Sequence, residues 1–374
     1  MFYLTVGVLL LESVKSSTIT PQKLLGGKVS ISNIGIGTWA WGDKLYWNYE
    51  SSQDASLKEV FDYCVKEGGV NFFDTAEIYG FGRSELLCGR FRRQLSEVST
   101  QSQVVLATKF APLPFRLGSD CVVSACQDSL DRMGVDKMGL YQLHWPGLIN
   151  NDAYLEGLVK CYEKGLVESV GVSNYGPELL RKAHKYLSDR GVPLASNQIQ
   201  YSLLCRQAES NSLLRTAEEL GVTILAYSPL AQGLLTGKFD SGKLPTGPRS
   251  ALARATLPKI KENVLLAIKN IAVEKSNALN LNVTMSQVAL NWLVHSIICT
   301  APRTFSYMVN NHYYTSYNRC VAKGTVPIPG ARSLSQAKDN CDALKWSLDE
   351  AEVKLLDEKA RDSGVNIPTP LQGR

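Results

Sequence analysis

Short β-branched or apolar runs alternate with stretches of helical periodicity along most of the 374-residue chain. Runs of this kind, bounded by turn residues, are typical of buried strands. The eight candidate strands are Asn33–Gly37, Asn71–Asp74, Val104–Phe110, Leu140–Leu143, Ser169–Val172, Ser196–Tyr201, Thr223–Tyr227 and Thr325–Ile328. We expect the first to be the weakest, because it is short and carries two glycines.

The stretches between these runs place apolar residues three and four positions apart, as amphipathic helices do. Positions that share one helical face are Leu57, Val60, Phe61, Cys64 and Val65 in the first helix and Leu213, Leu214, Ala217 and Leu220 in a later one. Strand and helix alternate about eight times, which predicts a parallel sheet closed into a barrel. The predicted fold is therefore α/β, a single-domain (β/α)8 TIM barrel.

An open, doubly wound sheet is the alternative fold, and it would usually carry a glycine-rich fingerprint after its first strand. The nearest match, residues 80–85 (GFGRSE), lacks the third glycine and follows the second strand. We interpret it as a loop and a helix start. A dinucleotide would then have to be bound without that phosphate turn.

Two segments interrupt the alternation. Residues 228–258 follow the seventh strand, and loops after strands lie on the face of a barrel where sites form. This segment is therefore placed to cover a ligand.

Residues 296–321 follow a predicted helix, Thr284–His295, and connect it to the eighth strand, although connections from helix to strand are usually short. We interpret them as an atypical insertion, a candidate for disorder, on the face opposite the site, where it would weaken docking of the eighth strand.

Domain boundaries follow from these patterns. Residues 1–23 are expected to be a poorly ordered leader, and residues 24–374 to form the barrel. The apolar start of the chain is too short to span a bilayer, and it resembles neither a good signal peptide nor an evident transit peptide. We therefore expect no membrane association.

Composition narrows the class of protein. Forty basic and 35 acidic residues give a net charge of +5 without a basic run, so binding to nucleic acid is not expected. The nine cysteines include no CxxC pair, which disfavours both a zinc site and a disulfide framework. We expect reduced thiols and no bound metal.

Four polar residues arrive at the ends of consecutive strands. Asp74 ends the second strand and Tyr79 follows in the next loop, while Lys109 ends the third strand and His144 the fourth. Taken singly, Asp74 has an alternative role as a helix cap, Tyr79 as a rim aromatic, Lys109 as a solvated cation and His144 as a structural histidine. Their joint arrival at one rim favours a catalytic group.

Carbonyl reduction by hydride needs such a group, because the developing alkoxide requires a proton. A tyrosine with a pKa of ~10 gives up its proton poorly. We expect the Lys109 ammonium to lower the pKa of Tyr79 and Asp74 to hold that ammonium in place. His144 would orient the carbonyl and donate a hydrogen bond to its oxygen.

The motifs around these residues resemble those of the aldo-keto reductase family. They are FFDTAEIYG at 72–80, ATKF at 107–110, LYQLHWPG at 140–147, GVSNYG at 171–176, NQIQYSLL at 197–204, AYSPLAQGLLTGKF at 226–239 and VPIPGARSLSQAKDN at 326–340. The resemblance extends from about Leu24 to Asp357, apart from the insertion. The motifs resemble most those of the plant and cyanobacterial, plastid-type branch of the family, which includes pyridoxal reductase-like members.

This resemblance implies an NADP(H)-dependent reductase of aldehydes or ketones, with Tyr79 as the proton donor. It implies cofactor contacts for the nicotinamide carboxamide (Ser173, Asn174, Gln198), the nicotinamide ring (Tyr227), the pyrophosphate (Ser228, Leu230, Gln232, Gly233) and the adenosine end (Gly330, Arg332, Gln336, Asn340). Arg332 is the expected partner of a 2′-phosphate, which favours NADPH over NADH.

Two alternatives to an active reductase stay open from the sequence. One is an NADPH-binding regulatory subunit resembling potassium-channel β subunits, and the other is a splice variant inactivated by the insertion. The expected compartment is the plastid stroma or the cytoplasm. No pattern in the sequence indicates an oligomeric state.

The substrate is expected to be a small carbonyl compound, such as pyridoxal or a reactive aldehyde. An aromatic substrate slot is expected from Trp41, Tyr46, Trp47, Phe81, Trp145 and Pro146.

Overall fold

Eight parallel strands form the central sheet. The computed structural model of the chain describes residues 22–147, 151–240, 242–247, 249–294, 306–309, 312–315 and 325–369. In spatial order the strands of the sheet are β12 (Val326–Pro327), β9 (Thr223–Tyr227), β8 (Leu194–Gln200), β7 (Val167–Ser173), β6 (Met138–Leu143), β5 (Val105–Phe110), β4 (Phe72–Asp74) and β3 (Ile36–Gly37). All eight predicted strands are confirmed, with ends shifted by a few residues.

The first and last strands meet and close the sheet into a barrel. Gly35 N donates to Pro327 O at 2.9 Å and Gly37 N donates to Pro329 O at 3.0 Å. Gly37 and Gly330 also form a parallel bridge. These contacts exclude the open, doubly wound alternative. On its other side β12 pairs with β9, so the eighth strand is docked despite the preceding insertion.

Glycines make this closure sterically possible. A Cβ atom on Gly37 would lie 2.8 Å from the carbonyl oxygen of Ile328, and one on Gly35 would lie 2.5 Å from Cδ1 of Phe72. Real Cβ atoms do not approach so closely, so a side chain at Gly37 would disturb the seam with the β12 segment, and one at Gly35 would collide with Phe72 of β4. The two glycines that weaken the first strand as a sequence pattern are therefore the reason it fits.

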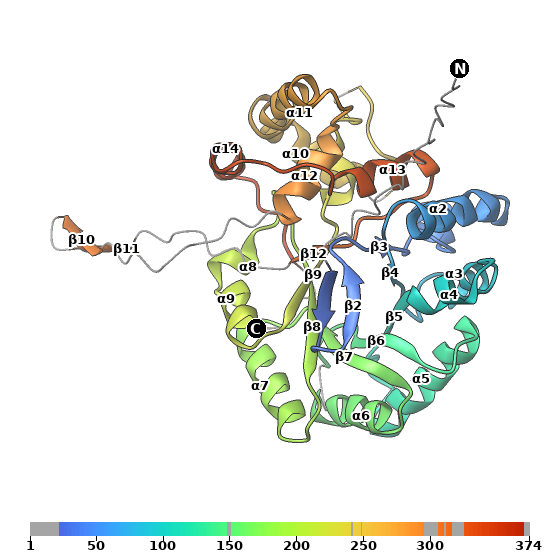
Figure 1. Cartoon of the computed structure of the whole chain (residues 1–374). Coiled ribbons are helices and arrows are strands. Elements are labelled where there is room, and N and C mark those ends of the chain that lie inside the picture. The colour runs from blue at the N-terminus through green and yellow to red at the C-terminus, as the bar shows by residue number, and fades with distance from the viewer. Residues whose placement is uncertain are drawn as a thin grey trace, which may run out of the picture.

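Helices surround the sheet, as Figure 1 shows. They are α1 (Lys44–Trp47), α2 (Asp54–Lys66), α3 (Arg83–Arg93), α4 (Val98–Gln103), α5 (Ser119–Met133), α6 (Asn151–Glu163), α7 (Pro177–Ser188), α8 (Gln207–Ser210), α9 (Leu213–Glu219), α10 (Arg249–Ile260), α11 (Leu266–Leu279), α12 (Met285–Val294), α13 (Leu334–Asp342) and α14 (Glu350–Asp362). Short 3-10 turns occupy Ser51–Gln53 and Ala231–Thr236, and a π-helical turn occupies Lys261–Leu265.

The helical faces predicted from periodicity are buried against the sheet. Leu57, Val60, Phe61 and Cys64 of α2 are at most 1% exposed. In α9, Leu213, Leu214 and Ala217 are also buried, and Leu220 packs against them. Burial of these stripes gives the domain its main core, between the sheet and the helical layer.

An N-terminal hairpin that was not predicted closes one end of the barrel. β1 (Gln22–Leu25) and β2 (Val29–Ser32) pair antiparallel around Gly26 and Gly27, both with positive φ. Leu25, Val29 and Ile31 pack on residues inside the barrel, and Ser32 N donates to the side chain of Asn71, just before β4. The hairpin thus covers the end where the strands begin, and Figure 1 shows β2 inside the ring of strands. A Gly-Gly pair between two apolar runs is itself a hairpin signal.

The irregular segments are partly described. Residues 228–258 contain the 3-10 turn and most of α10. Most of the 296–321 insertion lies outside the described residues. Its two described stretches, β10 (Ser306–Val309) and β11 (His312–Thr315), pair with each other. The expected leader also lies outside, except that β1 begins at Gln22. No helix in the described parts is long and apolar enough to cross a membrane.

We predict that Gly37→Ala destabilises the protein, because the new Cβ would collide with the Ile328 carbonyl at the barrel seam. The expected loss is about 1–3 kcal/mol in the free energy of unfolding, measured by urea titration. Gly242→Ala is the control, since its Cβ would approach only Asp240 Oδ1, at 3.4 Å. Equal stability of the two variants would contradict this account of barrel closure.

Candidate active site

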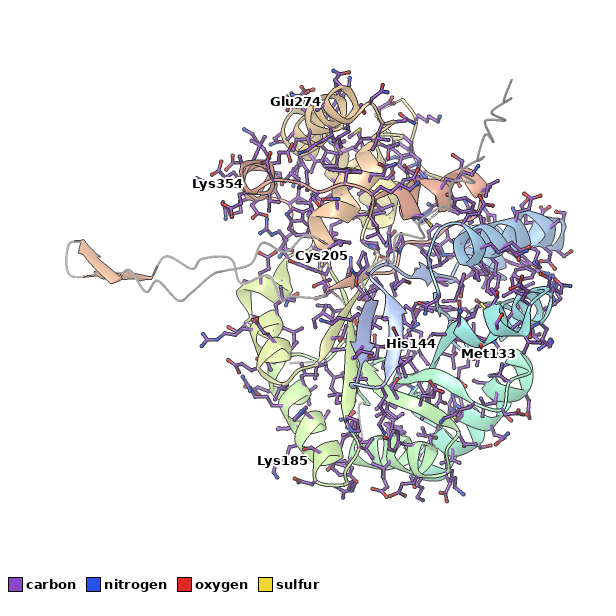
Figure 2. The ribbon with its side chains drawn as sticks, in the orientation of Figure 1. Met133, His144, Lys185, Cys205, Glu274 and Lys354 are labelled. Carbon is purple, nitrogen blue, oxygen red and sulfur yellow. The ribbon has the colours of Figure 1, made fainter. Side chains whose placement is uncertain are left out.

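The four predicted catalytic residues come together at the end of the barrel where the strands finish. Asp74 ends β4, Lys109 is the next-to-last residue of β5 and His144 follows β6, while Tyr79 lies in the loop after β4. Parallel strands deliver their carboxyl ends to one rim, so residues far apart in sequence become neighbours. Figure 2 shows His144 within the ring of strands, whereas Lys185, Glu274 and Lys354 lie on the outer helices.

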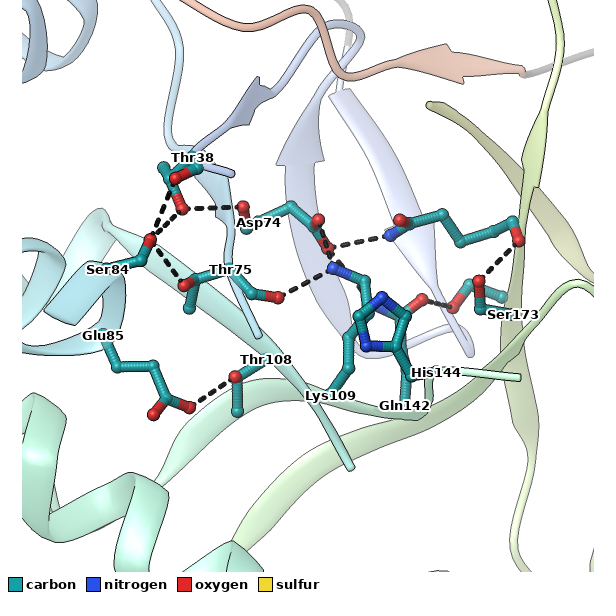
Figure 3. Close-up of polar contacts among 12 residues, drawn as sticks. Thr38, Asp74, Thr75, Ser84, Glu85, Thr108, Lys109, Gln142, His144 and Ser173 are labelled. Atoms are coloured by element: carbon teal, nitrogen blue, oxygen red, sulfur yellow. Dashed lines mark hydrogen bonds and ion pairs between the residues drawn. The ribbon is translucent and has the colours of Figure 1, made fainter. Parts of the chain in front are cut away.

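Asp74 and Lys109 form an ion pair that is almost completely removed from water. Lys109 Nζ lies 2.5 Å from Asp74 Oδ2 and donates a second hydrogen bond, 2.7 Å long, to the carbonyl oxygen of Thr75 (Figure 3). The two side chains are 0% and 2% exposed. Burial lowers the pKa of Lys109, and the Asp74 carboxylate opposes this shift.

Two amide side chains complete the coordination of Asp74. Its Oδ1 accepts from Gln198 Nε2 at 2.8 Å and from Gln142 Nε2 at 3.2 Å. Because both oxygens have donors, the carboxylate is satisfied inside the barrel. Gln142 was not among the predicted site residues, although it lies two residues before His144, in a position that points into the barrel.

A network of hydroxyl groups holds the end of β4. Thr38 Oγ1 donates to the Asp74 carbonyl at 3.0 Å and lies 2.7 Å from Ser84 Oγ, while Thr75 Oγ1 donates to Ser84 Oγ at 2.8 Å (Figure 3). All of these groups are buried. The network ties the Asp74 carbonyl and the Thr75 side chain to the first turn of α3, which fixes the end of β4.

Tyr79 lies next to the ion pair. Lys109 Nζ is 5.1 Å from the centre of the Tyr79 ring, and the imidazole of His144 meets that ring edge-on at 5.6 Å. Burial, followed by the carboxylates of Asp74 and Asp43, raises the pKa of Tyr79 well above 10. The net lowering of this pKa that was expected from Lys109 is not found, because burial and the two carboxylates outweigh the ammonium. Asp74 offsets the charge of the ammonium, and desolvation favours the neutral phenol.

His144 is held in its neutral form. Burial, followed by the nearby ammonium of Lys109, lowers the pKa of His144 well below 6.5. Its backbone N donates to the Phe110 carbonyl at 2.8 Å, whereas Nδ1 has no hydrogen-bond partner among the described residues. The ring is thus positioned by its backbone and retains free capacity for a ligand.

A cleft of about 820 Å³ opens above these residues. Every predicted catalytic and cofactor-binding residue lines it except Lys109, which lies beneath Asp74, and Ser173. Ser173 Oγ donates to the Gln198 carbonyl and accepts from Asn174 Nδ2. Asn174 itself faces the cleft, where its Oδ1 accepts from Tyr227 OH at 3.0 Å. Ser173 therefore supports Asn174 from behind in this structure.

The predicted adenosine-binding residues gather where β12 leads into α13. Arg332 N donates to Gln336 Oε1 at 2.8 Å, and Asn340 Nδ2 donates to the Gly330 carbonyl at 3.3 Å. The side chain of Ser333 caps α13 by accepting from Gln336 N. These bonds hold one compact turn against the cleft.

Three cations share this part of the cleft. The guanidinium groups of Arg249 and Arg332 lie 4.5 Å and 5.6 Å from the Trp47 ring, and Lys238 also lines the cleft. After burial, the largest effects that lower the pKa of Lys238 come from Arg249 and Arg332. No carboxylate of the described residues lies within ion-pair distance of any of the three, so none of these charges is neutralised by an ion pair in that part of the chain.

Lys238 and Arg249 were not predicted as site residues. Both lie in the 228–258 segment that was expected to cover a ligand, so their charge within that loop was the available signal.

The loop after β3 reaches across the cleft to the loop after β9. Tyr46 OH donates to Gln232 Oε1 at 2.9 Å, and Arg332 Nη1 donates to the Trp47 carbonyl at 2.9 Å. Gln232 has a φ of 56°, a left-handed conformation that is uncommon outside glycine. The segment 43–47 therefore forms a strap over the cleft.

The predicted aromatic slot is partly wrong. Trp41 is completely buried in the core and donates to the Ala331 carbonyl, and Phe81 is 93% exposed outside the cleft. Trp47 and Trp145 do line the cleft, together with Trp39, which the prediction omitted. Trp39 and Trp41 would share one face if the strand continued, but residues 39–42 form a turn, so the two rings lie on different sides of the chain.

Comparison with known proteins agrees with this geometry. A family model described as the aldo/keto reductase family matches residues 33–361. The chain is 43% identical over 351 residues to the chloroplastic pyridoxal reductase of Arabidopsis thaliana, a match that covers 91% of this chain and 87% of that one. The chain therefore belongs to the aldo/keto reductase family.

Solved structures show the same fold. A glycerol dehydrogenase from Gluconobacter oxydans matches with a TM-score of 0.71 and 25% identity, covering 93% of this chain and 98% of that one. An aldo-keto reductase from Klebsiella pneumoniae in complex with NADPH matches with a TM-score of 0.61 and 25% identity, covering 89% and 93%. The predicted family, barrel fold and enzyme class, an oxidoreductase, are confirmed.

We predict that His144 makes folding stability sensitive to acid. Its pKa is lower in the folded protein than in the unfolded chain, so its contribution is present above pH 6.5 and is lost as the pH falls below that value. Urea unfolding between pH 7.5 and 5 should show a slope that His144→Gln reduces by up to about 1.4 kcal/mol per pH unit. A slope that His144→Gln leaves unchanged would refute the assignment.

Proposed function

We propose that this protein reduces aldehydes or ketones to alcohols, with NADP(H) as cofactor and Tyr79 as proton donor. The observation that carries the proposal is the buried Asp74–Lys109 pair beside Tyr79, at the base of a cleft whose other part holds unpaired cations. A phenol, a neutral imidazole and an anion receptor in one cleft suit carbonyl reduction by a phosphorylated hydride donor.

The residues present fit such a cofactor. Arg332, Arg249 and Lys238 offer guanidinium and ammonium donors that have no carboxylate partner among the described residues, and such donors suit phosphate groups. Gln232 and Gly233 lie in the loop after β9, beneath the strap, where a pyrophosphate would be enclosed. Asn174, Gln198 and Tyr227 line the cleft nearest to Asp74 and would hold the nicotinamide. When bound, NADPH supplies the hydride.

The protein side chains control the proton. The raised pKa keeps the Tyr79 phenol protonated at neutral pH, so the acid is present before a substrate arrives. As the carbonyl oxygen gains negative charge, Tyr79 transfers its proton to that oxygen, and the Lys109 ammonium favours the phenolate that remains. Neutral His144 donates a hydrogen bond to the same oxygen and does not compete as an acid, because its pKa is low.

Pyridoxal or another reactive carbonyl compound is the proposed substrate. Support comes from the 43% identity to a protein named pyridoxal reductase and from the tryptophans, Trp39 and Trp145, that flank Tyr79 and His144. The same relative is named chloroplastic, which supports the plastid stroma ahead of the cytoplasm.

Tyr79→Phe should retain NADPH binding but lose at least about 100-fold in kcat, because only the transferable proton is removed. NADPH oxidation at 340 nm with pyridoxal, methylglyoxal and 4-nitrobenzaldehyde measures kcat, and fluorescence quenching measures binding. Tyr186→Phe is the control, since Tyr186 OH bonds Glu156 between α6 and α7, away from the cleft. Full activity in Tyr79→Phe would rule out Tyr79 as the donor.

The wild-type protein distinguishes this proposal from the two alternatives. NADPH binding without turnover of any aldehyde would favour a regulatory subunit. Loss of both binding and cooperative unfolding would favour an inactive variant, although β12 is paired on both sides in the structure.

Arg332→Gln should weaken NADPH binding by about 10- to 100-fold and change NADH binding much less, because a guanidinium pairs with a 2′-phosphate that NADH lacks. Titration of both cofactors gives the ratio of dissociation constants. Arg254→Gln, an exposed arginine on α10 outside the cleft, should leave that ratio unchanged. An equal loss of affinity for both cofactors would mean that another cation of the cluster, and not Arg332, binds the 2′-phosphate.

A further inference from the structure

Asp43 places a fixed carboxylate on the wall of the cleft. Its Oδ1 accepts from the backbone N of Tyr46 at 2.8 Å, which caps α1, and its Oδ2 accepts from Trp39 Nε1 at 2.9 Å. Both bonds lie within one short segment, so the carboxylate and the Trp39 ring are oriented together. Asp43 and Trp39 both line the cleft.

This carboxylate has no cation of its own. In the described chain, no lysine or arginine forms an ion pair with Asp43, whereas Asp74 is paired with Lys109. Lys238, Arg249 and Arg332 are the cations of the cleft, and the two arginines contact Trp47. If phosphates occupy that cluster, as the proposed function requires, Asp43 remains the uncompensated charge on the side of Tyr79.

Asp43 is close enough to Tyr79 for its charge to matter there. It is one of the two carboxylates that raise the pKa of Tyr79. The Trp39 ring, which Asp43 holds, lies 6.1 Å from the Tyr79 ring at an interplanar angle of 27° and stacks on Tyr46 at 4.8 Å. On the opposite side, Trp145 lies 4.9 Å from the ring of His144.

We propose that Asp43 determines the charge preference of the substrate site, so that flat, neutral or cationic aldehydes are reduced in preference to aldehydes that carry a carboxylate or a phosphate. The proposal rests on the proposed reductase function. A substrate whose carbonyl reaches Tyr79 and His144 lies along the Trp39 wall. An anionic substituent on it then meets a like charge in a partly desolvated cleft.

Matched pairs of aldehydes test this proposal. At saturating NADPH, kcat/KM is measured for two pairs, in which 4-nitrobenzaldehyde is compared with 4-carboxybenzaldehyde, and pyridoxal with pyridoxal 5′-phosphate. The wild type should prefer the uncharged member by about tenfold or more. Added salt should narrow the gap by accelerating the anionic member, because salt screens the repulsion.

Asp43→Asn should reduce the preference several-fold. The ratio is taken within one variant, so a general loss of activity cancels. Lys44→Gln is the control, because it changes the charge at the adjacent, exposed position and should keep the wild-type ratio.

The possible failures are distinct. No turnover of any aldehyde would overturn the reductase function and this inference with it. Turnover of both members of each pair at equal kcat/KM by the wild type would overturn the charge preference alone. A preference that survives in Asp43→Asn would also overturn the assignment to Asp43. The wild-type ratio and its salt dependence decide whether the charge preference exists even if Asp43→Asn fails to fold.

Discussion

A lysine ammonium lies inside the barrel with no access to water, and the rest of the site depends on how it is held. Removing such a charge from water costs several kcal/mol unless its partners are well placed. Asp74 and the Thr75 carbonyl receive the ammonium, two glutamines bond the other carboxylate oxygen, and a hydroxyl network fixes the end of β4. The pair is consequently nearly neutral as a unit. Burial, followed by the carboxylates of Asp74 and Asp43, keeps the pKa of Tyr79 raised, although an ammonium lies 5.1 Å from its ring.

Barrel closure places this pair at the base of a cleft. β3 and β12 are each only two residues long, and glycines let their backbones approach where side chains would collide. The N-terminal hairpin fills the opposite end with Leu25, Val29 and Ile31, so the rim at the strand ends is the open one. The site therefore depends on packing at two places distant from it, the seam and the hairpin.

Charge is divided within the cleft. Arg249 and Arg332 contact Trp47, on the strap that follows β3, whereas Asp74 and Asp43 act on Tyr79 and a third carboxylate, Asp339, lines the cleft from α13. In the proposed function, the arginines bind phosphate groups and the groups beside Tyr79 act on the carbonyl. The strap links both sides, because Asp43 caps the helix that carries Tyr46 and Trp47.

The sequence alone determined the strands, the amphipathic helices and the residues that reach the rim. Strand periodicity and strand ends are local properties, so Asp74, Lys109 and His144 were predictable as neighbours once the alternation was recognised. Only the tertiary structure decided which charged and polar groups lie close enough to affect one another. Four features depend on distances between separate loops. They are the direction of the Tyr79 pKa shift, the second amide that bonds Asp74, the cation cluster that includes Lys238 and Arg249, and the presence of Trp39 instead of Trp41 in the cleft. Local sequence carries no information on such distances, and near Tyr79 burial adds a desolvation effect that outweighs the nearby ammonium.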